Sequence, residues 1–398
     1  MNSRLPQLKP SVLALKGEAA YKTQSRADEL EAMGRSIIRL EIGQPDFAPP
    51  PHVIEATHEA LRAGKTRYTH PLGLPELRRA VAEHVSASRG VAVTPEMVGI
   101  TPSVKTAIFL CMGAVLEAGD EAIYPDPGYP TYGDAIRFYG AVPKPLPFTE
   151  KNGFDLDLAA LKELLGPKTK LLVINSPSNP LGSIVSRETL AKLPALFKER
   201  GASPWVLSDE IYSRLVYDGA TRAPSVYSIP GMQERTFLLD GFSKIYAMTG
   251  WRLGFVIFPE KFTADMDRLF VNSFACVSTF VQYGGVSALT GPQDTVFSMV
   301  KEFEKRRNFI VDALNGIPGV KCEKPSGAFY VFPNIKKFGK PSTDIAHALL
   351  EEVGVALLPG DAFGAHGEGH LRISYANSIE NLKEGVRRLG EYLRTLAI

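Results

Sequence analysis

The 398-residue sequence lacks the features that mark several large classes of protein. It has three cysteines, Cys111, Cys276 and Cys322, which lie far apart and form no CxxC pair. We therefore expect buried thiols in a reducing cytoplasm rather than a disulfide framework. The seven histidines show no HExxH or other metal-ligand spacing. No metal site is predicted.

Long apolar runs and an excess of charge of one sign are also missing. No stretch reaches the roughly 18 consecutive apolar residues that a membrane helix needs. Pro6, Lys9 and Pro10 interrupt the N-terminal segment where a signal peptide would have its apolar core. Lys and Arg number 45 against 43 Asp and Glu, which gives a net charge of +2. This balance provides no cationic surface for DNA or an anionic membrane, so we expect no nucleic-acid partner, no membrane and a cytoplasmic location.

What the chain does contain is an alternation of strand and helix patterns. Its length predicts two or three domains at about 150 residues each. Four apolar runs each end in a turn with polar residues, at 121–130, 170–180, 205–212 and 236–244. Helical patterns occupy 52–63, 75–89, 104–117 and 186–200. Such alternation predicts an α/β fold with a doubly wound, mostly parallel sheet, in which ligands bind beyond the carboxyl ends of the strands.

The pattern changes after about residue 285. A long helical stretch at 294–314 precedes an α+β region with short apolar segments at 327–334, 353–364 and 371–376. We predict a large domain over 47–285 and a smaller C-terminal domain over 286–398. The N-terminal segment, 1–46, is expected to pack with the smaller domain, because the apolar run at 37–42 needs a strand partner.

Polar side chains follow the predicted strands. Asp209 ends an apolar run, and a carboxylate there needs a positively charged partner. Tyr212 follows in the same turn, Asn179 lies between prolines, and Arg252 lies eight residues beyond Lys244. A lone lysine after a strand is typically solvated. Together, however, these amine, acid, phenol, amide and guanidinium groups are those that a pyridoxal phosphate ring requires, with the amine forming a Schiff base.

Eight motifs carry a resemblance to a known family. They are RLEIGQPDF (39–47), YTHPLGLPELR (68–78), YPDPGYPTY (124–132), NSPSNPLG (175–182), SDEIY (208–212), GFSKIYAMTGWRLG (241–254), GAFY (327–330) and LRISYA (371–376). In their order and spacing they resemble the class I/II pyridoxal-phosphate-dependent aminotransferases, the aspartate-aminotransferase-like group of fold type I. The resemblance runs from about residue 5 to the C-terminus. It implies a seven-stranded sheet in the large domain.

The resemblance implies a role for each matching side chain around the cofactor ring. Lys244 would hold pyridoxal phosphate as a Schiff base and then move the proton of the substrate α-carbon. Asp209 would keep the pyridine nitrogen protonated. Tyr212 and Asn179 would hydrogen-bond the phenolic oxygen of the ring, and Tyr129 would stack on the ring.

It also implies a phosphate site. Arg252 and Ser243 would bind the phosphate together with the backbone amides of Ser103, Val104 and Lys105. These three residues begin a predicted helix, whose dipole and free N–H groups favour an anion. The segment 101–106 reads TPSVKT where relatives commonly carry glycines, so this backbone must approach the phosphate without the conformational freedom of glycine.

Two further matches concern the partner subunit and the substrate. Tyr68 matches a tyrosine that reaches the phosphate of the neighbouring subunit, which implies a homodimer. Arg372 matches the arginine that binds the substrate α-carboxylate in a bidentate fork, with the backbone of Gly43 and the amide of Asn179 nearby.

The predicted activity is that of a transaminase. It would move an amino group from an L-amino acid to a 2-oxo acid, with 2-oxoglutarate as the expected acceptor, by a ping-pong mechanism. The alternative on the same fold is a pyridoxal-phosphate-dependent carbon–sulfur or other β-eliminating lyase. A nucleotide-dependent oxidoreductase is disfavoured because the glycine-rich segment 360–369 does not fit GxGxxG. A pyridoxal-phosphate-dependent transcription regulator would need a DNA-binding domain for which the chain has no spare length.

The substrate side chain is left open by the sequence. Lys16 and Lys105 are candidate cations for a distal carboxylate, although each is expected to be solvated or engaged elsewhere. The segments GEAAYK (17–22) and NSFACVSTFVQ (272–282) are candidates for the lining of the side-chain pocket.

Overall fold

A computed structural model describes residues 8–396. Residues 1–7, which include Pro6 and the start of the expected N-terminal segment, lie outside the described residues. Within residues 8–396, no helix combines the length and the apolar character needed to cross a bilayer. Nor do His, Cys, Asp and Glu side chains of this range gather into a group that could hold a metal ion.

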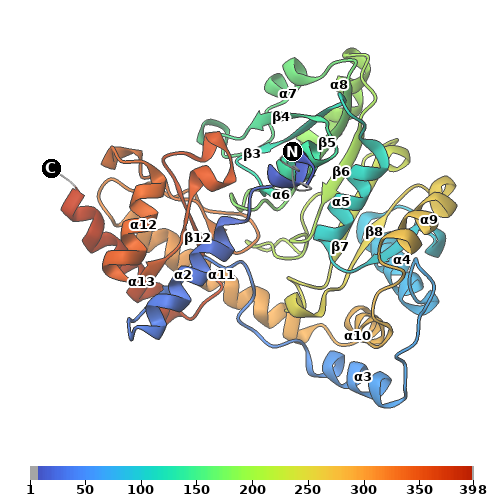
Figure 1. Ribbon diagram of the computed structural model, residues 1–398, viewed down its shortest axis with the longest axis horizontal. Helices are drawn as coiled ribbons and strands as arrows, with labels where there is room; N and C mark the ends of the chain where they lie inside the picture. Colours follow the sequence, from blue (N-terminus) through green and yellow to red (C-terminus); the bar gives the residue numbers. More distant parts are fainter. Residues whose placement is uncertain (1–7, 397–398) are drawn as a thin grey trace, which may run out of the picture.

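A seven-stranded sheet forms the centre of the molecule, with strand order β2-β8-β7-β6-β5-β3-β4 (Figure 1). The strands are β2 (Val98–Thr101), β3 (Glu121–Asp126), β4 (Val142–Pro147), β5 (Thr169–Asn175), β6 (Trp205–Asp209), β7 (Thr236–Gly241) and β8 (Gly254–Ile257). Only β8 runs antiparallel to its neighbours. The predicted mixed α/β fold with a mostly parallel, seven-stranded sheet is confirmed.

Helices pack around this sheet. They are α3 (Pro51–Arg62), α4 (Pro75–Arg89), α5 (Val104–Val115), α6 (Thr131–Phe138), α7 (Leu158–Leu164), α8 (Arg187–Glu199), α9 (Thr263–Ser273) and α10 (Thr279–Thr290). Every residue of β2, β7 and β8 is buried, as expected for strands that are covered on both faces. Helix α5 contacts β6, β7 and β8, which places its N-terminus beside the ends of the central strands.

The C-terminal region has a sheet of its own. A three-stranded antiparallel sheet has the order β11 (Leu358–Pro359), β12 (Leu371–Ser374) and β9 (Tyr330–Val331). It lies among α11 (Asp294–Asn315), α12 (Ser342–Val353) and α13 (Ile379–Leu396). Figure 1 shows this orange and red region beside the central sheet.

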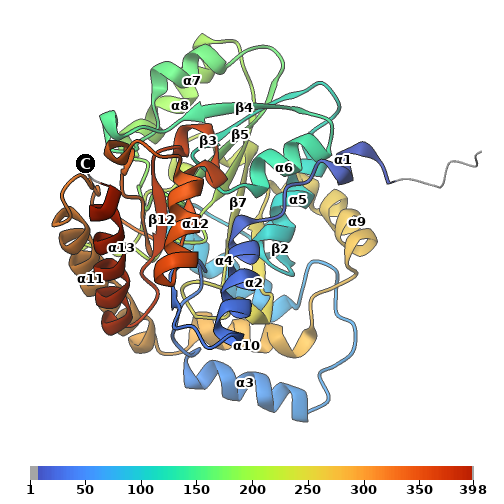
Figure 2. The ribbon, with the colours of Figure 1, turned by 60° about the vertical axis from the view of Figure 1, so that its left-hand side comes forward.

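The N-terminal segment contacts both regions: its first helix packs against α6, and the later part lies against the C-terminal region. It contains α1 (Pro10–Leu13), α2 (Ala19–Ala32) and β1 (Ile38–Arg39), and β1 pairs in parallel with β10 (Val355–Ala356). Figure 2 shows α2 beside α12, and Arg26 of α2 binds Glu351 of α12 through two hydrogen bonds of 2.7 and 3.0 Å. One apolar core includes side chains from the central and C-terminal regions. The domain boundaries at residues 46 and 285 therefore stay a prediction.

Strands β2, β4 and β8 were not among the strands expected from the sequence. Strand β4 has the sequence VPKPLP, and proline lacks the N–H group that a central strand donates. It is tolerated because β4 lies at the edge of the sheet, with β3 as its only neighbour there. The four expected strands end at residues 126, 175, 209 and 241, where the turns with the polar residues begin.

Candidate active site

A cavity of about 830 Å³ opens at the carboxyl ends of β5, β6 and β7. Most of the residues singled out in the sequence line it. They are Gly43, Ser103, Val104, Lys105, Tyr129, Asn179, Asp209, Tyr212, Ser243, Lys244, Arg252 and Arg372. Tyr68 is not among the lining residues and is 91% exposed. Its expected contact with a neighbouring subunit stays a prediction.

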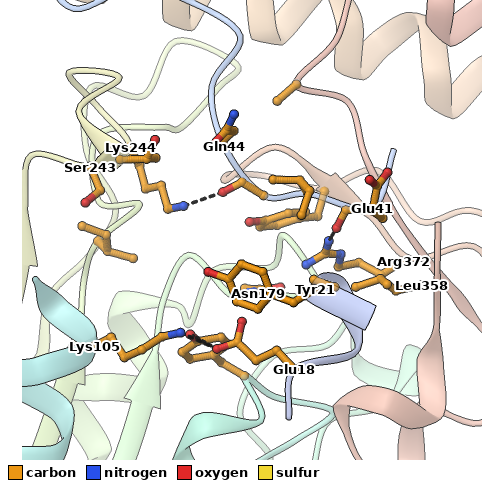
Figure 3. Close-up of a pocket in the computed structure, with 18 of the residues that line it drawn as sticks. Glu18, Tyr21, Glu41, Gln44, Lys105, Asn179, Ser243, Lys244, Leu358 and Arg372 are labelled. Carbon is orange, nitrogen blue, oxygen red and sulfur yellow. Dashed lines mark hydrogen bonds and ion pairs between the residues drawn. The ribbon is translucent and has the colours of Figure 1, made fainter. Parts of the chain in front are cut away.

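Lys244 follows the end of β7 and directs its amine into the cavity. The amine donates a hydrogen bond of 2.5 Å to the backbone carbonyl of Gly43 (Figure 3). Burial lowers the pKa of Lys244 to about 8, and the positive charges of Arg372, Arg252 and Lys105 act in the same direction. The lower pKa enlarges the neutral fraction of the amine near pH 7, and the neutral amine is the nucleophilic form.

Asp209 is the last residue of β6 and is buried. Its Oδ2 accepts a hydrogen bond of 2.7 Å from the Tyr132 hydroxyl, and its Oδ1 accepts one of 3.3 Å from the backbone N–H of Ile211. Burial raises the pKa of Asp209 to about 6, against the effect of these two hydrogen bonds. Both donors are neutral, so the carboxylate can still take a positively charged partner from the cavity.

A phenol and an amide lie near Asp209. The hydroxyl groups of Tyr212 and Tyr330 are 2.8 Å apart. Asn179 is held by its backbone N–H, which donates to Oδ1 of Asn175 at 2.9 Å. The side-chain Oδ1 of Asn179 is buried and has no hydrogen-bond partner among the described residues. Burying a polar atom without a hydrogen-bond partner costs free energy, so this amide is suited to hydrogen-bond a ligand in the cavity.

The N-terminus of α5 forms one wall of the cavity. Ser103 is its N-cap, and the Ser103 hydroxyl accepts a hydrogen bond of 3.2 Å from the backbone N–H of Thr106. Ser103 has φ 130°, a conformation that favours glycine and that other residues rarely adopt. A Cβ atom at Gly254 would lie 2.8 Å from the backbone nitrogen of Val104, so glycine is needed for this close approach. The free N–H groups of the first turn favour an anion.

Arg252 and Ser243 complete this wall. Arg252 donates a hydrogen bond of 2.7 Å from Nη1 to the carbonyl of Thr249, and its other nitrogens are available to the cavity. Ser243 is buried beside Lys244 and lines the same cavity. This part of the site combines a guanidinium, a hydroxyl and a helix N-terminus, which is a donor set for a phosphate group.

Arg372 enters the cavity from β12, on the side opposite to Lys244 in Figure 3. It is buried, and its Nη2 donates to the backbone carbonyl of Glu41. The guanidinium carbon lies 4.7 Å from the centre of the Tyr330 ring and 5.2 Å from that of Phe363. Its Nε has no partner among residues 8–396, so a bidentate carboxylate can still be bound.

Glu18 is a member of this site that the sequence did not single out. Its carboxylate forms an ion pair with Nζ of Lys105 and accepts a hydrogen bond of 2.8 Å from the Tyr129 hydroxyl. Figure 3 shows Glu18 and Lys105 pointing toward one another. Lys105, one of two candidate cations for a distal carboxylate, is thus engaged by the chain itself, while Lys16 is exposed and does not line the cavity.

One of the two expected pocket segments lines the cavity and the other does not. Glu18, Ala19, Ala20 and Tyr21 of the segment 17–22 are lining residues. The expectation for 272–282 stays a prediction, because no residue of this segment lines the cavity of its own chain. The reason is that 272–282 spans the end of α9 and the start of α10, and α10 packs against α3 and α4.

Tyr132, Tyr330 and Glu41 were also missed. Tyr132 and Tyr330 lie in the motifs YPDPGYPTY and GAFY, and their contacts with Asp209 and Tyr212 depend on segments far apart in the sequence. Glu41 is buried, and its Oε1 accepts from Arg39 at 3.3 Å. The spacing of Arg39 and Glu41, two residues apart on one face of an extended segment, is a signal that could have indicated this pair.

Comparisons with known proteins agree with this arrangement. The family model described as "Aminotransferase class I and II" matches residues 35–389. The chain is 39% identical to a probable aspartate/prephenate aminotransferase of Aquifex aeolicus, across 99% of this chain and 98% of that protein. It is 39% identical to an aspartate aminotransferase of Pyrococcus horikoshii, across 96% of each chain. The solved aromatic aminotransferase of Pyrococcus horikoshii superposes with a TM-score of 0.87 at 37% identity, covering 93% of this chain and 100% of that one.

Proposed function

The chain belongs to the class I and II aminotransferases, whose members use pyridoxal phosphate, and we propose that it transfers an amino group from an L-amino acid to 2-oxoglutarate by a ping-pong mechanism. One observation carries the proposal. At the ends of three adjacent strands, Asn179, Asp209 and Lys244 face a single cavity that also contains Arg252 and Arg372.

The residues of the cavity fit pyridoxal phosphate. The Asp209 carboxylate is held only by neutral donors and can pair with a protonated ring nitrogen. The unpaired amide of Asn179 and the hydroxyl of Tyr212 would hydrogen-bond the ring oxygen. The ring of Tyr129, a lining residue, would stack on the cofactor ring.

The phosphate would be held at the N-terminus of α5. Arg252 and Ser243 would bind it together with the backbone amides of Ser103, Val104 and Lys105. Glycine at position 254 allows β8 to pack closely against the first turn of α5, because a Cβ atom there would lie 2.8 Å from the backbone nitrogen of Val104. The guanidinium and the helix dipole both favour the negatively charged group.

Pyridoxal phosphate, when bound at Lys244, would supply a ring that accepts the electron pair of the substrate α-carbon. The substrate amine would replace the Lys244 amine on the cofactor, and the freed Lys244 amine would move the proton from the α-carbon to the cofactor. In the reverse half-reaction, Lys244 would move a proton back to the α-carbon. Its lowered pKa, about 8, suits a group that both accepts and donates a proton near neutral pH. The carbonyl of Gly43 holds this amine in place.

Arg372 would orient both substrates by the carboxylate that they share. Its guanidinium is fixed by the carbonyl of Glu41 and by the rings of Tyr330 and Phe363. A fixed planar fork binds a carboxylate at two points and sets the direction of the α-carbon. Amino donor and oxo acceptor therefore present the same atom to Lys244 in turn.

We also propose a homodimer in which Tyr68 reaches the phosphate of the neighbouring subunit. Tyr68 is 91% exposed and lies outside the cavity of its own chain, so its hydroxyl is available to a second copy.

The experiment is a panel of amino donors with 2-oxoglutarate as acceptor, scored for glutamate. We expect glutamate to form from at least one donor, and formation to stop in Lys244→Ala but not in Lys162→Ala, a partly exposed lysine of α7 that pairs with Glu199 outside the cavity. Pyruvate and ammonia released from cysteine-like compounds without an added oxo acid, together with no glutamate from any donor, would instead indicate a β-eliminating lyase.

A further inference from the structure

We propose that Glu18 is a specificity-determining residue that disfavours substrates with a second carboxylate, so that the enzyme prefers L-amino donors with an uncharged, apolar or aromatic side chain. The inference rests on the transaminase function proposed above. It follows from how the charges that line the cavity are already paired.

The positively charged residues that line the cavity are Arg39, Lys105, Lys244, Arg252 and Arg372. The last three have the roles described above. Arg39 is bound by carboxylates of the same chain, with Asp28 at 2.5 Å, Glu31 at 2.6 Å and Glu41 at 3.3 Å. Lys105 is bound by Glu18. Among the residues of this chain that line the cavity, the two cations without a role described above, Arg39 and Lys105, are therefore both already paired with carboxylates.

Two side chains of the cavity hold the Glu18 carboxylate in place. It precedes α2 at the N-cap position, yet its side chain makes no capping hydrogen bond and turns toward Lys105 instead. The Tyr129 hydroxyl gives the same carboxylate oxygen a second partner at 2.8 Å. Glu18 lines the same cavity as the reacting amine of Lys244.

The surroundings of the pair suit an uncharged side chain. Nζ of Lys105 lies 5.9 Å from the centre of the Tyr21 ring and 5.7 Å from that of Tyr129. Leu358 and Phe363 line the same cavity from the C-terminal region. These rings and aliphatic groups provide apolar contacts, whereas a second carboxylate would meet the like charge of Glu18 or would have to displace it from Lys105.

This arrangement sets an expectation for the acceptor as well. 2-Oxoglutarate carries the second carboxylate, so it must separate Glu18 from Lys105 in order to bind. We expect it to be used with a higher KM than an uncharged 2-oxo acid of similar size. Removing the charge of Glu18 should then release Lys105 for the distal carboxylate of either dicarboxylate.

The test compares Glu18→Gln with Glu29→Gln in the holoenzyme. Glu29 lies on α2, the helix that Glu18 precedes, and it is exposed and does not line the cavity. We expect the ratio of kcat/KM for aspartate to that for phenylalanine to rise about tenfold in Glu18→Gln, equivalent to about 1.4 kcal/mol. The ratio should not change in Glu29→Gln. The gain should disappear in the double variant Glu18→Gln/Lys105→Gln, which removes the released cation.

Calorimetry with unreactive acids provides a measurement that does not depend on turnover. Maleate should bind Glu18→Gln about tenfold more tightly than the unsubstituted holoenzyme, while 3-phenylpropanoate should not gain affinity. An unchanged substrate ratio, equal gains for both acids, or a gain that persists in the double variant would overturn the role of Glu18. If the unsubstituted enzyme transfers no amino group from any donor, the proposed function fails instead.

Discussion

The two sides of the cavity differ in how their charged groups are held. On the side of the central sheet, Asp209 has only neutral partners, and the amine of Lys244 is held by a backbone carbonyl. On the side of the N-terminal and C-terminal segments, the carboxylates of Glu18 and Glu41 are already paired with Lys105 and Arg39. The sheet side is thus suited to a tightly bound cofactor, and the opposite side to substrates that bind and are released.

This difference separates the groups that take part in the reaction from the groups that select the substrate. A buried acid and an amine with a lowered pKa are costly unless a bound group uses them, so the sheet side supplies reactivity. Ion pairs that a substrate must accommodate or displace decide which substrate binds, so the opposite side supplies specificity. Variants on the sheet side should affect all substrates, and those on the opposite side should distinguish among them or act on binding.

The largest effect is expected on the sheet side, from Lys244→Ala. Loss of the amine removes the group that moves the α-proton, so kcat should fall by roughly 10⁴-fold or more. Pyridoxal phosphate should remain bound through Asp209 and Arg252. Steady-state kinetics and cofactor content measured on the purified variant test this, with Lys162→Ala as control. A variant that retains a tenth of the activity would contradict the role of Lys244.

Asp209→Ala should have the next largest effect. Without the carboxylate nothing in the described chain would keep the ring nitrogen protonated, and kcat should fall by about 10²–10⁴-fold for every donor alike. The cofactor should still be retained at the phosphate site, which absorbance of the dialysed protein measures. Near-normal rates in Asp209→Ala would show that the acid does not act on the cofactor.

Arg372→Lys tests the opposite side of the cavity. Lysine keeps the charge but lacks the planar fork, so kcat/KM should fall by about 10–100-fold for all donors, mainly through KM. This loss should not depend on the substrate side chain, in contrast to the effect of Glu18→Gln. A selective loss for one donor would show that Arg372 contacts the side chain rather than the shared carboxylate.

The smallest effect concerns stability and requires the apoenzyme. Burial raises the pKa of Asp209 from 3.8 to about 6, so the stability associated with its neutral form is lost as the pH rises through about 6. Asp209→Asn should therefore stabilise the apoenzyme at pH 8, by at most about 3 kcal/mol at 1.36 kcal/mol per pKa unit. The gain should shrink toward pH 5.

Thermal denaturation of the apoenzymes at pH 8 and pH 5 measures this difference in Tm. Asp312→Asn, an exposed aspartate on α11, is the matched control and should not change Tm at either pH. An equal gain at both pH values, or no gain at pH 8, would show that Asp209 is not destabilised by burial.

The sequence predicted the sheet side better than the opposite side. Asp209 ends one apolar run and Lys244 follows another, both runs predict buried strands, and parallel strands bring their carboxyl ends to one edge of the sheet. Strand β4, with its prolines, could not be recognised because its edge position is a property of the whole sheet. The local sequence pattern thus indicated that Lys244 and Asp209 lie at the same edge of the sheet. It could not indicate strand β4, which depends on its position in the folded sheet.

The opposite side depends on contacts between distant segments. Glu18 meets Lys105, 87 residues away, and Tyr212 meets Tyr330, 118 residues away. No local spacing encodes such pairs, so Glu18 could be placed only in a segment that was a candidate for the pocket. Arg372, by contrast, could be identified from its motif although it lies in a buried strand.

Reduction of the holoenzyme with borohydride, followed by peptide mapping, tests the central claim most directly. If Lys244 holds pyridoxal phosphate as a Schiff base, reduction should attach the cofactor irreversibly to the peptide that contains Lys244. The absorbance of the linkage should disappear in the same step. A cofactor fixed to Lys105 or to any other lysine, or none fixed at all, would contradict the assignment of this cavity.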